Sequence, residues 1–337
     1  MIADATKQVK SGRSLDQSQM TQIVDAIMQG DCSDAQIKKF LVALHEKGES
    51  VEEVAGAATA LRQHMQPIRT RRENVVDTCG TGGGKSGTFN ISTAAAIVAS
   101  SAGASVAKHG NRRSTSKTGS ADVLKQLGVN IECSIAIVQK CLDQLGLCFC
   151  FAPLFHPSMK HVSSVRRSLD HPTIFNLLGP LCNPVGAPFQ VLGAGRSETR
   201  GLIAQTLALL GTTRSIVVHS RDGLGEISVA GPTDVCEVSG KHVTEGTLTP
   251  QDFGIEARQP MLIQADDPAE SAEIILRVLA GHPGAPRDIV VANAAAALWI
   301  SGMADSPLRG AERCAAAIDN GLAQEMLNEL IDMTNKG

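Results

Sequence analysis

The sequence predicts an α/β protein with a small, entirely helical domain at its N-terminus and a largely parallel central sheet flanked by helices. Three observations predict this class. Before residue 70, apolar residues recur at the spacing of amphipathic helices. After residue 71, short apolar segments alternate with helical segments, which is typical of a parallel sheet covered by helices. A basic segment at 69–72 separates the two patterns, and we interpret it as a solvated boundary.

The first 70 residues predict three amphipathic helices joined by short loops. The first covers residues 16–29 and ends at Gly30, a natural helix stop. Capping-box patterns start the second helix at Ser33 and the third at Ser50, and Pro67 follows the third. Three such helices predict a small bundle, which can serve as a packing domain or as a dimer surface.

The rest of the chain predicts strands and helices in alternation. Helices are expected at 93–101, at 120–127 and through most of 268–330. Inside that last region, residues 289–291 predict either a strand or a buried helix. The expected strands are short apolar runs, at 75–76, 105–107, 147–151, 190–194 and 215–219.

Composition excludes several classes of protein. The formal net charge of −3 argues against a dedicated nucleic-acid binder. The nine cysteines include no CxxC pair, so we expect reduced thiols and a cytoplasmic protein. There is no apolar leader at the start and no run of eighteen apolar residues, so we expect neither secretion nor membrane insertion.

A glycine-rich turn and the polar segment after it are the strongest indication of function. The turn covers residues 80–84 and follows an apolar strand. Glycines let the backbone approach a ligand closely, and successive N–H groups in a turn form an anion-binding nest. The polar side chains that follow suit a phosphorylated, polyhydroxylated ligand, and they are Asn90, Ser92, Thr93, Lys108, His109, Asn111, Arg112, Ser116 and Ser120.

These features have competing interpretations. A P-loop nearly fits residues 79–86, but Cys79 replaces its first glycine and Gly87 interrupts the helix that must follow. Residues 108–112 form either a solvated turn or, since they follow a buried strand, a binding cluster. Ligands of parallel sheets lie beyond the carboxyl ends of the strands, where this cluster and the glycine-rich turn would both fall.

Two further segments allow a structural or a functional interpretation. His156 follows an apolar strand, and a lone histidine is more often structural than catalytic. Arg166 suits a carboxylate ligand, because its planar fork binds two oxygens. Residues 176–183 are rich in turn-forming residues, and the alternative to a functional role is that they form an ordinary loop.

Seven motifs in order resemble the anthranilate phosphoribosyltransferase family: GTGG, TFNIST, VAKHGNR, TGSADVL, FAPLFHP, IFNLLGPLCNP and HSRDGLGEIS. The resemblance extends from about residue 15 to 330. It implies a helical, dimerising domain of residues 1–70, joined by helices near 158–182, and an α/β domain of residues 71–337 that binds phosphoribosyl pyrophosphate. It also implies a homodimer.

The implied reaction transfers the phosphoribosyl group from phosphoribosyl pyrophosphate to the amine of anthranilate and releases pyrophosphate, a step of tryptophan biosynthesis. Magnesium, Lys108 and backbone N–H groups would stabilise the charge on the leaving pyrophosphate. The amine of anthranilate is neutral at pH 7, so the reaction needs no strong base. Alignment of the amine with the sugar carbon would supply much of the acceleration.

The resemblance assigns a role to each matching residue. The catalytic residues would be Lys108, Asn111 and Arg166. Magnesium would be held by Ser92 and Glu226, with Asp222 as an alternative ligand. Phosphoribosyl pyrophosphate would be bound by Gly80, Thr81, Gly82, Gly83, Thr88, Asn90, Ser92, Thr93, Lys108, Ser116 and Ser120. Anthranilate would be bound by Gly80, His109, Asn111, His156, Arg166, Gly179 and Pro180.

Three positions depart from the family pattern. Gly84 and Gly225 stand where the family usually has aspartate, and Pro172 stands where it often has arginine. Loss of two carboxylates removes hard oxygen ligands that magnesium favours. Either a second metal binds weakly, or Asp222 reaches in from the same loop.

Two other classes of function stay open. A related transferase or phosphorylase would use a different acceptor, such as a pyrimidine, but Asn111, His156 and Arg166 together match an aromatic carboxylate. A non-catalytic relative would bind nucleic acid, against which stand the net negative charge and the intact ribose-phosphate motif. The ordinary phosphoribosyltransferase fold would carry two adjacent acids within a hydrophobic strand and loop, and we find no such segment.

Overall fold

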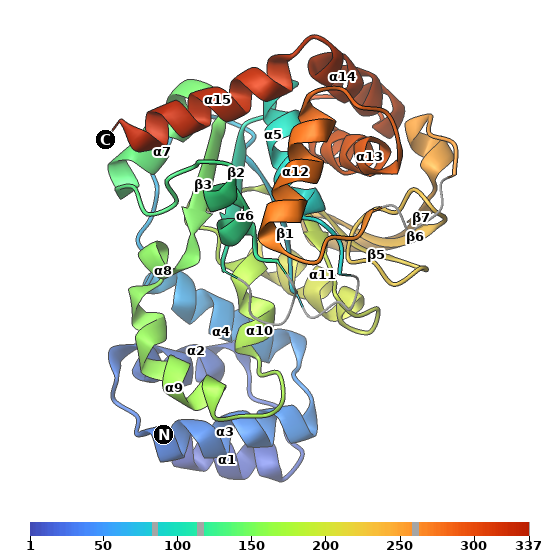
Figure 1. Cartoon of the computed structure of the whole chain (residues 1–337). Helices are drawn as coiled ribbons and strands as arrows, with labels where there is room; N and C mark the ends of the chain where they lie inside the picture. The colour runs from blue at the N-terminus through green and yellow to red at the C-terminus, as the bar shows by residue number, and fades with distance from the viewer. Residues whose placement is uncertain (83–86, 113–117, 258–262, 337) are drawn as a thin grey trace.

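A helical bundle packs against one side of a seven-stranded sheet in the computed structural model of the protein (Figure 1). The structure describes residues 1–82, 87–112, 118–257 and 263–336. None of the helices in this part of the chain is both long enough and apolar enough to cross a bilayer.

The N-terminal bundle contains the three expected helices and one more. Capping boxes at Asp16, Ser33 and Ser50 start three of them, which confirms the two capping boxes predicted from the sequence. The additional helix, α1, was not predicted, because it buries just three of its residues and half of the others are charged. The four helices are α1 (Ile2–Lys10), α2 (Gln17–Gln29), α3 (Asp34–Lys47) and α4 (Val51–Gln63).

The sheet has the strand order β3-β2-β1-β4-β5-β6-β7. The pairs from β3 to β5 are parallel, and β6 and β7 add an antiparallel hairpin at one edge. The sequence analysis missed this hairpin, since β7 is mostly exposed and polar. The strands are β1 (Val76–Gly80), β2 (Val106–Gly110), β3 (Leu147–Phe151), β4 (Phe189–Gly193), β5 (Arg214–Ser220), β6 (Thr233–Ser239) and β7 (His242–Leu248).

The boundaries of β2 correct one expectation. The strand predicted at 105–107 continues to Gly110, so Lys108 and His109 lie within the sheet and not in a solvated turn. Both are buried. Because side chains alternate across a strand, the two residues point to opposite faces of the sheet.

Helices cover both faces of the sheet. Residues 289–291, predicted as strand or buried helix, lie in the helix α13. The helices after the bundle are α5 (Ile91–Ser101), α6 (Ser120–Gln126), α7 (Ile135–Leu145), α8 (Ala152–Phe155), α9 (Lys160–Arg167), α10 (Phe175–Leu178), α11 (Thr199–Leu210), α12 (Pro268–Leu279), α13 (Ala285–Ile300), α14 (Pro307–Asp319) and α15 (Leu322–Asn335). Short 3₁₀ turns are η1 (Pro157–Met159), η2 (Gly179–Leu181) and η3 (Pro250–Phe253).

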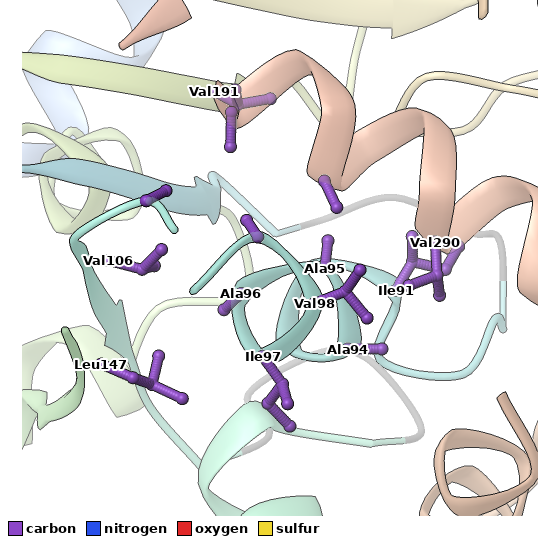
Figure 2. Packing of buried hydrophobic residues seen from close by; sticks show 14 of the residues in the cluster. Ile91, Ala94, Ala95, Ala96, Ile97, Val98, Val106, Leu147, Val191 and Val290 are labelled. Atoms are coloured by element: carbon purple, nitrogen blue, oxygen red, sulfur yellow. The ribbon is translucent and has the colours of Figure 1, made fainter. Parts of the chain in front are cut away.

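Two apolar cores lie on the two sides of the sheet. In the first, the alanine-rich α5 packs against the strands and α13. Figure 2 shows Ala95 and Val98 of α5 in one apolar cluster with Val191 of β4 and Val290 of α13. The second core joins the bundle to α9, α10, α11 and the other face of the sheet. The carboxyl ends of β1, β2 and β4 therefore open between two firmly packed layers.

We predict opposite effects for two glycine-to-alanine substitutions in helices. A Cβ at Gly56 of α4 would lie 2.5 Å from the carbonyl oxygen of Gln17 in α2, which cannot move cheaply. Gly56→Ala should therefore destabilise the protein by about 1–3 kcal/mol. Gly201 of α11 has nothing within 4 Å of the same position, so Gly201→Ala should be neutral or stabilise by up to about 1 kcal/mol.

The measurement is the free energy of unfolding in urea for both variants and the parent. A stable Gly56→Ala protein would show that α2 and α4 do not approach each other as closely as described here.

Candidate functional site

Glycines end the strands that form the floor of the site. Gly80 at the end of β1 pairs with Gly193 at the end of β4, and a Cβ on Gly80 would lie 3.1 Å from the Gly193 oxygen. The turn that follows is tied to β4, since Thr81 N–H donates to the Gly193 oxygen at 2.9 Å and Gly195 N–H donates to Thr81 Oγ1 at 3.0 Å. Gly82 has φ +68°, which favours glycine. Gly83 and Gly84 lie outside the described residues.

Lys108 of β2 is the charged centre of the site. Its side chain is 4% exposed, and its ammonium donates to the Thr78 carbonyl oxygen and, at 3.1 Å, to Ser92 Oγ. Burial lowers the pKa of Lys108, while the nearby Asp77, Cys79 and Glu226 oppose that shift. The ammonium thus lies between β1 and the start of α5.

The N-terminus of α5 presents polar groups that are not used up by capping. Asn90, its N-cap, makes no capping bond with its side chain and instead pairs with Ser271, which donates to Asn90 Oδ1 at 3.0 Å. Thr93 is 1% exposed, and its hydroxyl has no hydrogen-bond partner within the described parts of the chain. A helix N-terminus with free donors attracts anions. Thr88 lies just before it, bridged to Gln264.

Glu226 brings a carboxylate into the same cavity, which Thr78, Ser92, Gly193 and Asn293 also line. Its pKa rises to about 7, because burial outweighs the attraction of Lys108 and Asp222 adds repulsion. No hydrogen bond or ion pair of the described residues uses this carboxylate. A half-buried, unpaired carboxylate is costly unless a cation approaches it.

Asp222 is placed differently from the expectation that it reaches in as a substitute ligand. It is exposed, and its two carboxylate oxygens accept hydrogen bonds from the hydroxyls of Ser220 and Ser228. Leu224 N–H also donates to it, at 3.4 Å. The Asp222 carboxylate therefore stabilises the loop of residues 220–228 by hydrogen bonds within that loop.

His109 and His156 form a buried pair on the opposite face of the sheet from Lys108. Their Nε2 atoms lie 3.2 Å apart, and His109 Nδ1 lies 2.9 Å from the carbonyl oxygen of Gly179. That oxygen can only accept, so His109 carries its proton on Nδ1 and accepts at Nε2 from His156. The remaining nitrogen, His156 Nδ1, is buried without a partner among the described residues.

The turn at Gly179 and Pro180 is held by side chains that the sequence analysis did not identify. Gln190 of β4 donates to the Pro180 oxygen at 2.6 Å, and its amide also lies 3.4 Å from Asp77. Asp77 in turn accepts from the backbone N–H of His109 at 3.1 Å. These bonds join residues far apart in sequence, so no local pattern indicates them.

Arg166 and Asn111 make none of the described contacts of this second group. Arg166 of α9 is half-buried, its guanidinium lies 5.8 Å from the ring centre of Phe175, and it pairs with no carboxylate of the described residues. Phe175 begins α10, which leads directly to Gly179. The described contacts do not join Arg166 to the histidine pair directly.

Asn111 follows β2 and is exposed, with its oxygen accepting from Arg112 N–H at 2.8 Å. Ser120, the first residue of α6, donates to the Asn111 carbonyl oxygen at 3.3 Å. Ser116 lies outside the described residues. The site thus has an anion-binding half around Lys108 and α5, and a neutral half around the histidine pair.

Known proteins are similar to this chain in sequence and in fold. Residues 72–324 match the family described as glycosyl transferase family, a/b domain, and residues 3–65 match its helical bundle domain. An anthranilate phosphoribosyltransferase of Rhodopirellula baltica is 49% identical, with 98% of this chain and 97% of that protein covered.

Solved structures agree with these sequence matches. The anthranilate phosphoribosyltransferase of Thermus thermophilus has a TM-score of 0.93 at 37% identity, covering 98% of this chain and 99% of that one. The enzyme of Saccharomyces cerevisiae in complex with PRPP and Mg has a TM-score of 0.91 at 28% identity, covering 100% and 98%.

We predict that the histidine pair makes the protein less stable in mild acid. Burial lowers the pKa of His109 to about 3, with repulsion from His156 added, and lowers that of His156 to about 4, against an ordinary value of 6.5. Between pH 6.5 and 4 the unfolded chain therefore binds more protons than the folded chain, and stability falls as the pH falls. Each ring contributes up to about 1.4 kcal/mol per pH unit.

The measurement is the unfolding free energy between pH 7 and 4.5, compared with a variant that carries His109→Asn and His156→Asn. The variant should lose less stability over this range. Imidazolium signals from either ring at pH 5.5, seen by ¹⁵N NMR, would contradict the neutral pair.

Proposed function

The chain belongs to the anthranilate phosphoribosyltransferase family and transfers the phosphoribosyl group of phosphoribosyl pyrophosphate to the amine of anthranilate; we propose that it does so at the carboxyl ends of β1, β2 and β4. This placement depends on one observation, which is that the site has an anion-binding half around Lys108 and a neutral half around the histidine pair. Lys108 and the buried hydroxyl of Thr93, which has no hydrogen-bond partner among the described residues, suit a pyrophosphate. The neutral histidine pair together with Arg166 suits an aromatic acid.

The anion-binding half receives phosphoribosyl pyrophosphate in this proposal. The turn from Gly80 to Gly82 and the hydroxyl of Thr93 would donate to phosphate or ribose oxygens, together with Asn90 and Ser92. Lys108 already lies on Ser92, so its ammonium would stabilise the charge that collects on the leaving pyrophosphate. Gly83, Thr88, Ser116 and Ser120 complete the set on the basis of the family resemblance alone.

Magnesium is the expected cofactor, and its fit follows from the donors present. The described residues contain no group of three or more histidine, cysteine or acidic side chains arranged around one point. Magnesium is commonly held by one or two carboxylates together with substrate phosphates. The unpaired carboxylate of Glu226 and the hydroxyl of Ser92 line one cavity and fit that pattern. The bound ion would screen charge on the pyrophosphate.

The neutral half receives anthranilate. Arg166 has no carboxylate partner among the described residues, so its guanidinium would hold the carboxylate of the substrate and direct the amine. His156 Nδ1 would accept a hydrogen bond from the amine, since it is fixed as an acceptor by the proton order of the pair. Asn111 and the turn at Gly179 and Pro180 would border the path between the two halves.

Anthranilate fluorescence tests the proposal directly. Purified protein with phosphoribosyl pyrophosphate should consume anthranilate, and consumption should depend on magnesium. Absence of consumption at every magnesium concentration, with the protein folded, would contradict anthranilate as the acceptor. Replacement of anthranilate by a pyrimidine, and retention on heparin, would then test the two other classes of function.

We predict that Arg166→Ala weakens the use of anthranilate selectively. Loss of a charge-assisted pair with the carboxylate should raise the KM for anthranilate about tenfold or more. The KM for phosphoribosyl pyrophosphate should stay within about twofold, because no contact joins Arg166 to the Lys108 half in the described structure.

Steady-state kinetics with each substrate varied is the measurement, and Arg167→Ala is the matched control, since Arg167 is the exposed neighbour on the same helix. Equal changes in both KM values, or an unchanged KM for anthranilate, would remove Arg166 from the acceptor site.

The assembly and the cell compartment extend the proposal. We expect a homodimer formed through the helices of residues 1–70 and the adjacent α9 and α10, which sedimentation at several concentrations would test. A cytoplasmic location agrees with nine free cysteines, most of them buried. No nucleic acid or membrane partner is expected.

A further inference from the structure

Asn293 is the one polar residue among the buried residues of the apolar helix α13. Its side chain is 4% exposed. It makes three hydrogen bonds, two of which reach a loop 66 residues away in sequence. An amide buried in an apolar helix is costly unless it is fully bonded, so its presence needs a specific cause.

The partner of Asn293 is the backbone of Ile227. Ile227 N–H donates to Asn293 Oδ1 at 3.0 Å, and Asn293 Nδ2 donates to the Ile227 carbonyl oxygen at 2.9 Å. Asn293 Nδ2 also donates to the Ile289 oxygen of its own helix at 2.8 Å, which holds the amide in place. The asparagine therefore pairs with both polar groups of one residue, as a neighbouring strand would.

Glu226 immediately precedes Ile227 and depends on this attachment. On its other side, Leu224 N–H donates to Ser220 Oγ at 3.0 Å, and Ser220 N–H donates to the Leu224 oxygen at 2.9 Å. The loop is thus fixed before and after Glu226, while the Glu226 carboxylate has no hydrogen bond to any described residue. The backbone, and not a side-chain partner, sets the direction of that carboxylate.

We propose that Asn293 is a positioning residue that directs Glu226 toward the metal-bound pyrophosphate. Asn293 and Glu226 line the same cavity as Ser92. A shift of the loop backbone would therefore move the Glu226 carboxylate within the cavity proposed for the ion and the pyrophosphate. Gly225 contributes no side chain, and Asp222 is held by Ser220 and Ser228. This inference rests on the proposed function for its ligand, and on the Asn293 bonds for its mechanism.

The test measures binding and not turnover. Binding of Mn²⁺ to the whole protein with saturating phosphoribosyl pyrophosphate is followed by electron paramagnetic resonance, for the parent, Asn293→Leu, Asn293→Ala and Glu226→Gln. Asn293→Leu should weaken Mn²⁺ about tenfold, the loss common for residues that orient a metal ligand. Asn293→Ala should show a smaller loss, because water can enter the space and bond to Ile227.

A double variant separates positioning from general stability. If Asn293 acts through Glu226, Asn293→Leu should cost little further affinity in a Glu226→Gln background. Ile300→Ala, two turns along α13, removes a buried side chain that makes none of the hydrogen bonds to the loop, and it should leave Mn²⁺ affinity unchanged. Additive losses in the double variant, or an equal loss in Ile300→Ala, would overturn the proposal.

The outcome is independent of the acceptor. If the parent binds Mn²⁺ and fails to consume anthranilate, the coupling between Asn293 and Glu226 still supports the positioning role, while the proposed acceptor fails. If the parent consumes anthranilate and Asn293→Leu binds Mn²⁺ normally, the positioning role is wrong and the proposed function stands.

Discussion

The buried ammonium of Lys108 is the constraint on which the site depends. Removing a charge from water costs several kcal/mol, which must be offset by groups placed around it. Here the Thr78 carbonyl of β1 and the Ser92 hydroxyl of α5 accept hydrogen bonds from the ammonium. The acidic groups that oppose the fall of the Lys108 pKa belong to β1 and to the loop at Glu226. The charge can therefore be buried only when sheet, helix and loop are all in place. The same contacts place the ammonium between β1 and the first turn of α5.

The alternation of side chains along β2 divides the chemistry of the site. Lys108 contacts β1 and α5, and His109, one residue on, faces the turn at Gly179. A transferase needs a cationic environment for the leaving pyrophosphate and a neutral one for an uncharged amine. Burial keeps the pKa of His109 low, so no second cation competes with Lys108 for the pyrophosphate. One strand thus brings the two environments together without mixing them.

The sequence predicted elements with strong local patterns and missed those that depend on distant partners. The strand at 147–151 and the helix starts at Ser33 and Ser50 were predicted correctly, because an apolar run and a capping box are local. The exposed β7 has no apolar alternation to find. The strand expected at 105–107 was ended too early, because the polar Lys108 and His109 were interpreted as either a solvated turn or a binding cluster after the strand. In the site, the motifs indicated the residues that would touch substrate. Gln190 and Asn293 bond to backbone atoms of Pro180 and Ile227, and such partners follow from the tertiary fold alone.

The loop around Glu226 is held in place mainly through its backbone. Gly225 removes a side chain, and a Cβ at Gly193 would lie 1.7 Å from the Gly225 oxygen, so the two backbones meet there directly. Ser220 and Asn293 form hydrogen bonds with backbone groups of the loop, and the contact at Gly193 is also with backbone. These contacts therefore do not depend on the side chain at position 225. With a single carboxylate directed inward, the remaining oxygens around a magnesium ion would come from the pyrophosphate itself and from water. Metal and substrate would then bind as one unit, and the rigidity of the backbone at Glu226 would matter more than the number of acids beside it.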